Sequence, residues 1–368
     1  MGLRTGWFKQ LAQEWVVPEI TPERCVHSQC EVAECTRCVE ACPRDAWILD
    51  EDSLQIDTER CDGCGLCVAA CTESALGQSL LPAMRLLDSK KTLLFACEAN
   101  GEGYTGEGVV PCLHALDASL LLEHYLAGYQ QVLSCRGNCE TCPRHGGGDP
   151  FREQLIRLNL LLASRGAATV RHAQLSAQAW EEHKKASQVV YLQTGKTEAT
   201  TRRQFLHQAI SFAVEKGLKP AETTPSDPKA SLPWPTTLPA PPEGVADKVL
   251  YPFVPVLEAT LCNGCDACVQ LCPHQALQLE KTEAGQARAY RIQADHCTGC
   301  NICKDACDQQ AIQIELISWF KDEQVKLVTA NCKACGCQFH YPVSDNTVQQ
   351  HCRICAHTNH HRNLFQVY

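Results

Sequence analysis

Eight cysteines between residues 262 and 307 limit what this chain can fold into more than any other feature. They form two runs of identical spacing, Cys262-x2-Cys265-x2-Cys268-x3-Cys272-Pro273 and Cys297-x2-Cys300-x2-Cys303-x3-Cys307. Three thiols in so short a stretch require a tight loop, and Gly264 and Gly299 supply a permissive backbone for it. Tetrahedral zinc instead pairs two Cys-x2-Cys units across a longer gap. The spacing therefore favours an iron–sulfur cluster over a disulfide framework or a single zinc ion.

The same spacing resembles that of two-cluster bacterial ferredoxins. In that family, three neighbouring cysteines hold one [4Fe-4S] cluster and the fourth reaches over to the other cluster. The resemblance implies two ligand sets: Cys262, Cys265, Cys268 and Cys307 for one cluster, and Cys297, Cys300, Cys303 and Cys272 for its neighbour. We therefore expect a ferredoxin-like lobe over residues 251–320.

An internal repeat places a second such unit near the N-terminus, over residues 12–87. Its second run is regular, and Cys42-Pro43 matches Cys272-Pro273. Alternating polar and apolar residues between the runs predict a β-hairpin in each copy. The repeat implies a further cluster on four cysteines: Cys61, Cys64, Cys67 and Cys42.

The first run of this N-terminal copy is irregular. Val32 stands where a regular run has its first cysteine, so an enlarged loop must deliver one ligand. We prefer Cys25 to Cys30, because the lead-in Thr-Pro-Glu-Arg before Cys25 resembles the Asp-Thr-Glu-Arg before Cys61. The expected ligands of the fourth cluster are thus Cys25, Cys35, Cys38 and Cys71, with Cys30 left open.

Residues 88–195 have a different character, since short apolar runs alternate there with segments of helical spacing. The runs at 92–97, 108–111, 131–135, 168–170 and 189–192 predict strands, and 118–126 and 150–162 predict helices. Such alternation is typical of a small, mostly parallel three-layer α/β domain. Its five cysteines fall at or after strand ends, where open α/β sheets bind ligands: Cys97, Cys112, Cys135, Cys139 and Cys142.

This middle region resembles the small iron–sulfur (delta) subunit of methyl-viologen-reducing hydrogenases. The matching features are Cys97, Val-Pro-Cys112-Leu, the leucine-rich helix with Gly128, and the loop from Cys135 to Cys142. The resemblance implies an additional cluster, of [2Fe-2S] type, held by a subset of the five cysteines. Two other interpretations stay open: buried structural thiols, and the Cys-x3-Cys-x2-Cys motif of radical S-adenosylmethionine enzymes.

The remaining segments are a linker and a metal-binding tail. Residues 196–250 combine one amphipathic helix with a proline-rich, semi-rigid spacer. Residues 325–368 carry two Cys-x2-Cys knuckles that resemble a zinc ribbon, and rubredoxin-type iron is the alternative. The expected ligands of this ion are Cys332, Cys335, Cys352 and Cys355.

Composition narrows the function classes. The 27 cysteines at metal-ligand spacings favour a reducing, cytoplasmic compartment. The net charge of −9 argues against nucleic acid and for a basic docking face on a redox protein partner. We expect no transmembrane segment, and peripheral membrane association stays open.

The sequence as a whole predicts an α+β multidomain protein: two ferredoxin-like dicluster lobes, a three-layer α/β middle domain and a zinc-ribbon-like C-terminus. It resembles a bacterial polyferredoxin, a carrier or wiring subunit of an oxidoreductase system with no catalytic site of its own. The alternative is a protein that senses iron or oxygen, or assembles clusters.

Overall fold

The computed structural model describes residues 17–50, 53–98, 106–144, 147–185, 234–241, 249–320, 324–343 and 348–358. The chain divides into two compact units. Unit 1 comprises Met1–Cys25, Thr36–Ala163 and Ala167–Leu232, and unit 2 comprises Val26–Cys35, Ser164–Gly166 and Pro233–Tyr368. The strand expected at 189–192 and the linker helix lie outside the described residues, as does most of the proline-rich spacer.

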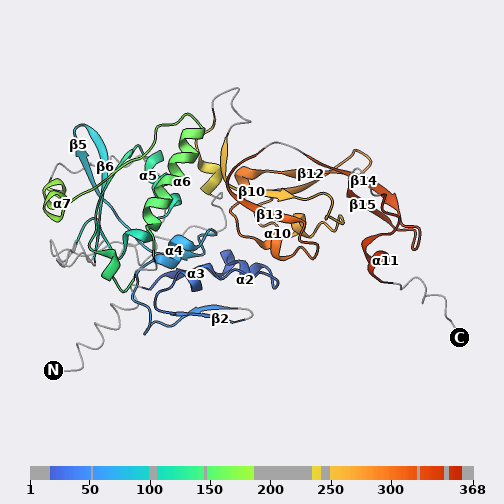
Figure 1. Cartoon of the computed structure of the whole chain (residues 1–368), viewed down its shortest axis with the longest axis horizontal. Helices are drawn as coiled ribbons and strands as arrows, with labels where there is room; N and C mark the ends of the chain where they lie inside the picture. Colours follow the sequence, from blue (N-terminus) through green and yellow to red (C-terminus); the bar gives the residue numbers. More distant parts are fainter. Residues whose placement is uncertain are drawn as a thin grey trace, which may run out of the picture. The chain divides into compact units, whose positions relative to one another are not determined.

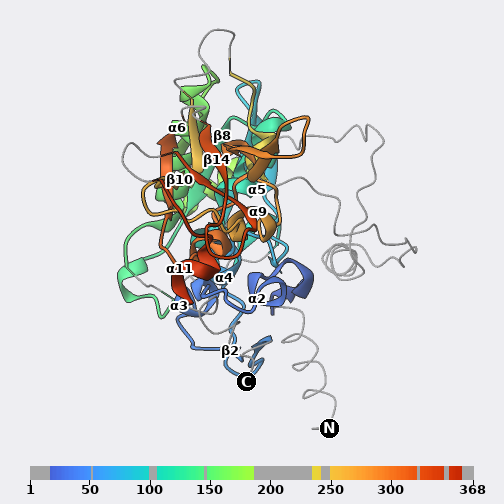
Figure 2. The ribbon, with the colours of Figure 1, turned by 90° about the vertical axis from the view of Figure 1, so that its right-hand side faces the viewer.

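Unit 1 contains the N-terminal lobe, which is built from two short antiparallel strand pairs and two one-turn helices. Strand β1 (Glu19–Ile20) pairs with β4 (Leu76–Gly77), and β2 (Trp47–Leu49) pairs with β3 (Leu54–Ile56). Helices α3 (Arg37–Glu40) and α4 (Leu66–Ala70) follow the cysteine loops, and α3 lies next to β2 (Figures 1 and 2). The expected hairpin between the cysteine runs is the β2–β3 pair.

The middle sheet of unit 1 has the order β5-β6-β8-β9, with β7 paired to β6. Its strands are β5 (Ala83–Leu87), β6 (Lys90–Cys97), β7 (Val109–Val110), β8 (Gln131–Cys135) and β9 (Arg171–Gln174). All pairs are parallel except β5–β6. Two differences from the sequence analysis stand out. Residues 83–87 belong to this sheet although they precede residue 88, and β9 begins at Arg171 rather than at Ala168.

Three helices pack against this sheet: α5 (Ala118–Leu126), α6 (Pro150–Ser164) and α7 (Ala177–Lys184). Figure 1 shows α7 on one side of β5 and β6, and α5 and α6 on the other. Trp180 of α7 is fully buried against Ala83, Leu94 and Leu133. Asp117 caps α5 by accepting a hydrogen bond from the Leu120 N–H at 2.8 Å.

Unit 2 contains the C-terminal lobe, which repeats the element order of the N-terminal one. Strand β10 (Leu250–Leu257) pairs with β13 (Ile312–Trp319), and β11 (Leu277–Lys281) pairs with β12 (Ala287–Ile292). Helices α9 (Ala267–Gln270) and α10 (Ile302–Asp305) follow the cysteine loops. The helix α2 (Val26–Gln29), from the enlarged N-terminal loop, also belongs to this unit, where Val26 packs with Ile302.

The C-terminal tail continues a sheet of this lobe. Strand β14 (Val325–Asn331) pairs with β12 on one side and with β15 (Gln338–Pro342) on the other, which gives the order β11-β12-β14-β15. Helix α11 (Arg353–His357) follows the second knuckle. Lobe and tail therefore share one sheet, although the sequence analysis treats them as neighbouring domains. Within the described residues, no helix combines the length and the hydrophobicity needed to cross a bilayer.

Candidate iron–sulfur and metal sites

The cysteines of the C-terminal lobe line two separate cavities. One is lined by Cys262, Cys265, Cys268 and Cys307, and the other by Cys297, Cys300, Cys303 and Cys272. In each set, three neighbouring thiols meet the fourth thiol of the other run, as expected from the resemblance. Burial, and then the nearby thiols of Cys262, Cys265 and Cys307, raise the pKa of Cys268 to about 12.

A repeated backbone turn places the fourth thiol of each of the four runs. The Sγ atom accepts a hydrogen bond from the N–H of the alanine four residues later: Cys42 from Ala46 at 3.4 Å, Cys71 from Ala75 at 3.3 Å, Cys272 from Ala276 at 3.2 Å and Cys307 from Ala311 at 3.3 Å. The residue before each alanine has a positive φ, between 46° and 55°. Hydrogen bonds to sulfur orient a ligand and tune a cluster's potential.

In the N-terminal lobe the structure brings Cys42 to Cys61, Cys64 and Cys67. Burial, the Cys64 thiol and then those of Cys61 and Cys42 raise the pKa of Cys67 to about 12, although the Trp47 side chain opposes the shift. Cys64 is also buried, and burial raises its pKa to about 11. The thiols of Cys42, Cys61 and Cys64 therefore lie near enough to Cys67 to affect its pKa.

One buried donor beside these thiols tests whether a cluster fits. The hydroxyl of Thr298, in the cavity of Cys297, has no hydrogen-bond partner among the described residues. A buried donor left unpaired is costly. Cluster sulfur would give this hydroxyl an acceptor, so the residues present fit an iron–sulfur cluster.

The irregular N-terminal set is less closely defined. Cys38 and Cys71 pack with Trp47 and Leu76 in unit 1, which also contains the buried Cys25. Cys30 and Cys35 belong to unit 2, where they pack against Val26, Ala33 and Ile302. The preference for Cys25 over Cys30 therefore stays a prediction.

Four of the five middle-domain thiols lie near one another, at or beyond the carboxyl end of β6, whose last residue is Cys97. Cys97 and Cys112 are hydrogen-bonded, and this contact and burial raise the pKa of Cys112. Burial raises the pKa of Cys139, and the thiols of Cys97 and Cys142 add to the shift. Cys135 packs instead in the core that contains Trp180.

Sequence reasoning missed His114, which lies beside these thiols and is buried. Its Nε2 is 3.9 Å from Cys139 Sγ, and its Nδ1 accepts a hydrogen bond from the Phe151 N–H at 3.3 Å. With Nδ1 as acceptor, the neutral ring carries its proton on Nε2 and points it at the Cys139 sulfur. The position of His114 two residues after Cys112 is the only signal in the sequence that could have suggested this.

Arg144 connects the N-terminal lobe to the middle sheet. Its guanidinium donates to the Asp62 carboxylate at 3.0 Å and to the Pro111 carbonyl at 2.7 Å. Asp62 follows Cys61, and Pro111 precedes Cys112. The thiol of Cys64 also contributes to the raised pKa of Cys112. The two groups of thiols are thus neighbours within unit 1.

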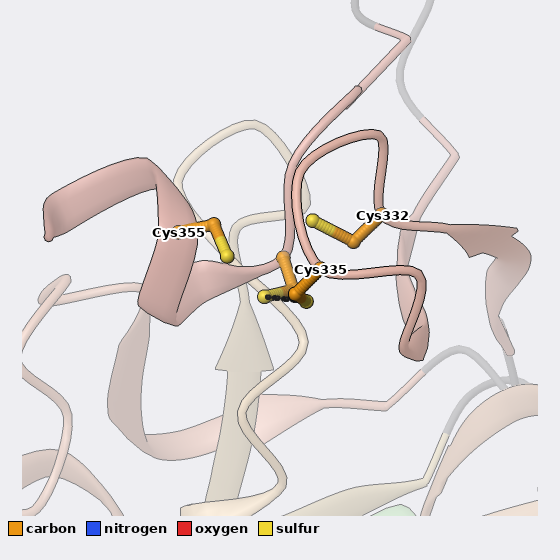
Figure 3. Close-up of side chains that lie close together, drawn as sticks. Cys332, Cys335 and Cys355 are labelled. Carbon is orange, nitrogen blue, oxygen red and sulfur yellow. Dashed lines mark hydrogen bonds between the residues drawn. The ribbon is translucent and has the colours of Figure 1, made fainter. Parts of the chain in front are cut away.

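The C-terminal knuckles form a compact single-ion site. The sulfurs of Cys332, Cys335, Cys352 and Cys355 all lie within 4.8 Å of one another, and those of Cys335 and Cys352 are 3.8 Å apart. Figure 3 shows Cys332, Cys335 and Cys355 directed toward a common centre. A Zn–S bond of about 2.3 Å in a tetrahedron requires sulfurs about 3.8 Å apart. The four thiols therefore fit one tetrahedral ion.

The protonation of Cys332 also suits a metal ligand. Burial raises its pKa, but backbone hydrogen bonds from Cys352, Cys335 and Ala334 outweigh that effect and lower the pKa to about 5. A thiolate is the form that binds metal. Cys337, beyond the turn at Gly336, is exposed and outside the four-sulfur group.

Comparisons with known proteins agree with both lobes. Residues 261–311 match the 4Fe-4S dicluster domain, and residues 54–76 match the 4Fe-4S binding domain. The chain is also 35% identical, over 72 residues, to a Proteus vulgaris protein described as a probable iron-sulfur subunit of the Frd operon. That match covers 19% of this chain and 46% of the relative. The chain thus has two ferredoxin-type 4Fe-4S domains.

Proposed function

We propose that this protein is a polyferredoxin that passes single electrons between redox partners in the cytoplasm, as a wiring subunit of an oxidoreductase system. The observation that carries the proposal is the interleaving of thiols from two runs around two neighbouring cavities. Bound [4Fe-4S] clusters supply one-electron chemistry with little rearrangement of the protein. The chain's own contribution is to place sulfur ligands, direct N–H groups at them and exclude water.

The proposed cofactors are four [4Fe-4S] clusters, a further iron–sulfur cluster in the middle domain and one zinc ion. Cys97, Cys112, Cys139 and Cys142 are the proposed ligands in the middle domain, because Cys97 is hydrogen-bonded to Cys112, and the thiols of Cys97 and Cys142 lie close enough to Cys139 to raise its pKa. Cys135 becomes a structural thiol in this proposal, since it packs with Trp180. A tetrahedral four-thiol site suits zinc and rubredoxin-type iron alike, and we propose zinc at the tail because the two Cys-x2-Cys knuckles have the spacing of a zinc ribbon.

The proposed partner is a redox protein with a basic docking face, because the chain carries a net charge of −9. The relative's description as an iron–sulfur subunit is compatible with membership of a redox complex. A sensing or assembly role remains the second candidate. Reversible reduction with all clusters retained supports wiring, and cluster loss coupled to partner binding supports sensing.

The first test is stoichiometric. Anaerobically prepared protein should contain about 16 iron atoms from four clusters, more if the middle domain holds one, and about one zinc. Iron below half that amount in a monodisperse, reconstituted sample would rule out four clusters.

A second test addresses the interleaved ligands. Cys307→Ala should damage the cluster of Cys262, Cys265 and Cys268, and leave the cluster of Cys297 and Cys300 in place. EPR and Mössbauer spectra of reduced protein distinguish the two outcomes. Cys337→Ala is the matched control, because this exposed thiol lies outside every proposed ligand set.

A further inference from the structure

A cavity of about 380 Å³ opens beside the carboxyl ends of β8 and β9, against the first turns of α6. Its size falls in the range of small-ligand pockets, about 300–1,000 Å³. The carboxyl ends of parallel strands are also where open α/β sheets bind ligands. None of the residues that line it belongs to a proposed cluster. The electron-transfer role therefore leaves this cavity without a function.

The inner wall of the cavity is apolar. Phe151, Leu155 and Val170 line it and are each at least 96% buried. Asn159 holds Val170 in place, because its amide group bonds both the N–H and the carbonyl of Val170, at 2.8 and 2.9 Å. Ile156 continues this surface to the rim, where it is half exposed. This wall can accept a flat or compact apolar group.

The rim carries one positive charge that is not compensated. Arg136 and Arg152 both line the cavity, and Asp149 pairs with Arg136 at 2.7 Å. Within the described residues, no ion pair or hydrogen bond is found for the Arg152 guanidinium, and the neighbouring Glu153 pairs with Arg157 at 3.9 Å. Burial lowers the pKa of His172, the other titratable group of the lining, so its ring adds no charge at neutral pH.

A serine–histidine pair in the wall does not indicate hydrolytic chemistry. Ser134 Oγ lies 2.8 Å from His172 Nε2, but the Ser134 side chain is 99% buried and cannot attack a bound substrate. The pair instead fixes the His172 ring, which stands edge-on to Phe151 with centroids 5.2 Å apart. These side chains position a ligand and do not react with it.

We propose that this cavity binds a small organic monoanion, with its carboxylate on Arg152 and its apolar body against Phe151, Leu155 and Val170. The site also borders the middle-domain thiols. Asp149, which pairs with Arg136, lies 3.7 Å from His114 Nδ1, and His114 lies 3.9 Å from Cys139 Sγ. The side chains of Asp149 and His114 thus connect the cavity to Cys139, a proposed cluster ligand.

The test uses the full-length protein, prepared without oxygen, and titration calorimetry with benzoate as the probe. Benzoate should bind saturably, and benzamide, which has the same ring without the charge, should bind at least about tenfold more weakly. Arg152→Gln should lower the affinity for benzoate by about tenfold or more, because the substitution removes a charge-assisted hydrogen bond. Arg157→Gln, on the same helix but outside the cavity, should leave benzoate affinity unchanged.

Three results would overturn the proposal: no saturable binding of benzoate, equal binding of benzamide, or unchanged benzoate affinity in Arg152→Gln. Ile156→Asp is a second variant, placed on the exposed rim where folding is little affected. The new carboxylate should repel benzoate, and a benzoate affinity equal to that of the unsubstituted protein would also contradict the proposed site. Iron is measured on every sample. Binding that persists in protein lacking clusters supports this cavity even if the wiring function fails.

Discussion

Asp266 shows how one side chain can stabilise a cluster loop. It follows Cys265, and its carboxylate accepts hydrogen bonds from the Tyr290 hydroxyl at 2.6 Å and from His340 Nε2 at 2.8 Å. Burial raises the pKa of Asp266, but the hydrogen bonds from His340 and Tyr290 outweigh burial and hold that pKa below its usual value. Its φ of 63° is left-handed, a conformation that Asp and Asn tolerate.

Asp266→Asn should destabilise unit 2 by about 1–3 kcal/mol, because both donors bond the same Oδ1 and a neutral amide oxygen accepts them more weakly than a charged carboxylate oxygen. Asn keeps the left-handed backbone conformation, so the loss measures the interactions of the Asp266 carboxylate with Tyr290, His340 and Arg353. Thermal unfolding by circular dichroism measures it. The control is Asp308→Asn, since Asp308 also follows a cluster cysteine but is exposed. Equal effects of the two substitutions would contradict this account.

Gly264 is required in the same loop for two separate reasons. Its φ is +71°, and a Cβ at this position would fall on the backbone carbonyl of His340 in β15. Gly285, in the β11–β12 turn, has a φ of +78°, and a Cβ placed there would have no neighbouring atom within 4 Å.

Both Gly264→Ala and Gly285→Ala should cost about 1 kcal/mol for the left-handed backbone. Gly264→Ala should cost clearly more, because β15 must also move away. Denaturant unfolding of the two variants under identical conditions gives the comparison. A Gly264→Ala variant no less stable than Gly285→Ala would show that the loop and β15 do not pack as described.

At the scale of elements, the tail and the C-terminal lobe support each other. Strand β14 extends the hairpin of β11 and β12, and Arg353, next to Cys352, donates to the Cys265 carbonyl at 2.6 Å. The four-thiol site holds the β14–β15 hairpin against α11. An ion bound at this site would therefore stabilise the backbone of the neighbouring loop at 262–266.

Removal of the tail's metal by a chelator should loosen β14, β15 and the loop at 262–266 together, because structural zinc contributes folding free energy directly. Hydrogen exchange with mass spectrometry should show faster exchange in these segments, and unchanged exchange in β6 and β8 of unit 1. Protection retained at 262–266 after metal removal would show that the tail and the loop are independent.

At the scale of the whole molecule, the N-terminal lobe and the middle sheet form one unit. Arg144 is largely buried and bonds both Asp62 and Pro111, which belong to these two parts. Arg44 bonds the same Asp62 carboxylate at 3.3 Å, but it is 42% exposed. A buried charge-assisted hydrogen bond contributes more than an exposed ion pair.

Arg144→Gln should therefore destabilise unit 1 by about 1.5–3 kcal/mol, and Arg44→Gln by less than about 1 kcal/mol. Unfolding monitored by circular dichroism measures the loss of stability in both variants. The reduction potential of the cluster on Cys61, Cys64 and Cys67 should also shift only in Arg144→Gln. Similar losses in the two variants would argue against Arg144 as the connection between lobe and sheet.

The cysteine spacing by itself predicted the two ferredoxin-type regions, and the alternation of polar and apolar residues between the cysteine runs predicted the hairpin within each. Ligand spacing is a local property, because the residues that wrap one cluster are close in sequence and need small or left-handed positions at set offsets. The alternation of strands and helices likewise predicted β6, β8, α5 and α6 close to their observed bounds. Local sequence patterns are enough to predict the type and bounds of an element when one of its faces is apolar along its whole length.

Only the tertiary structure decided which distant groups meet. Strand β5 joins the middle sheet, β14 joins the sheet of the C-terminal lobe, and His114 reaches Cys139. Cys135 and Ser134 are adjacent in sequence yet point to opposite faces of β8, one toward Trp180 and the other toward His172. Such outcomes depend on strand pairing and packing between residues far apart in the chain, and no local spacing encodes them.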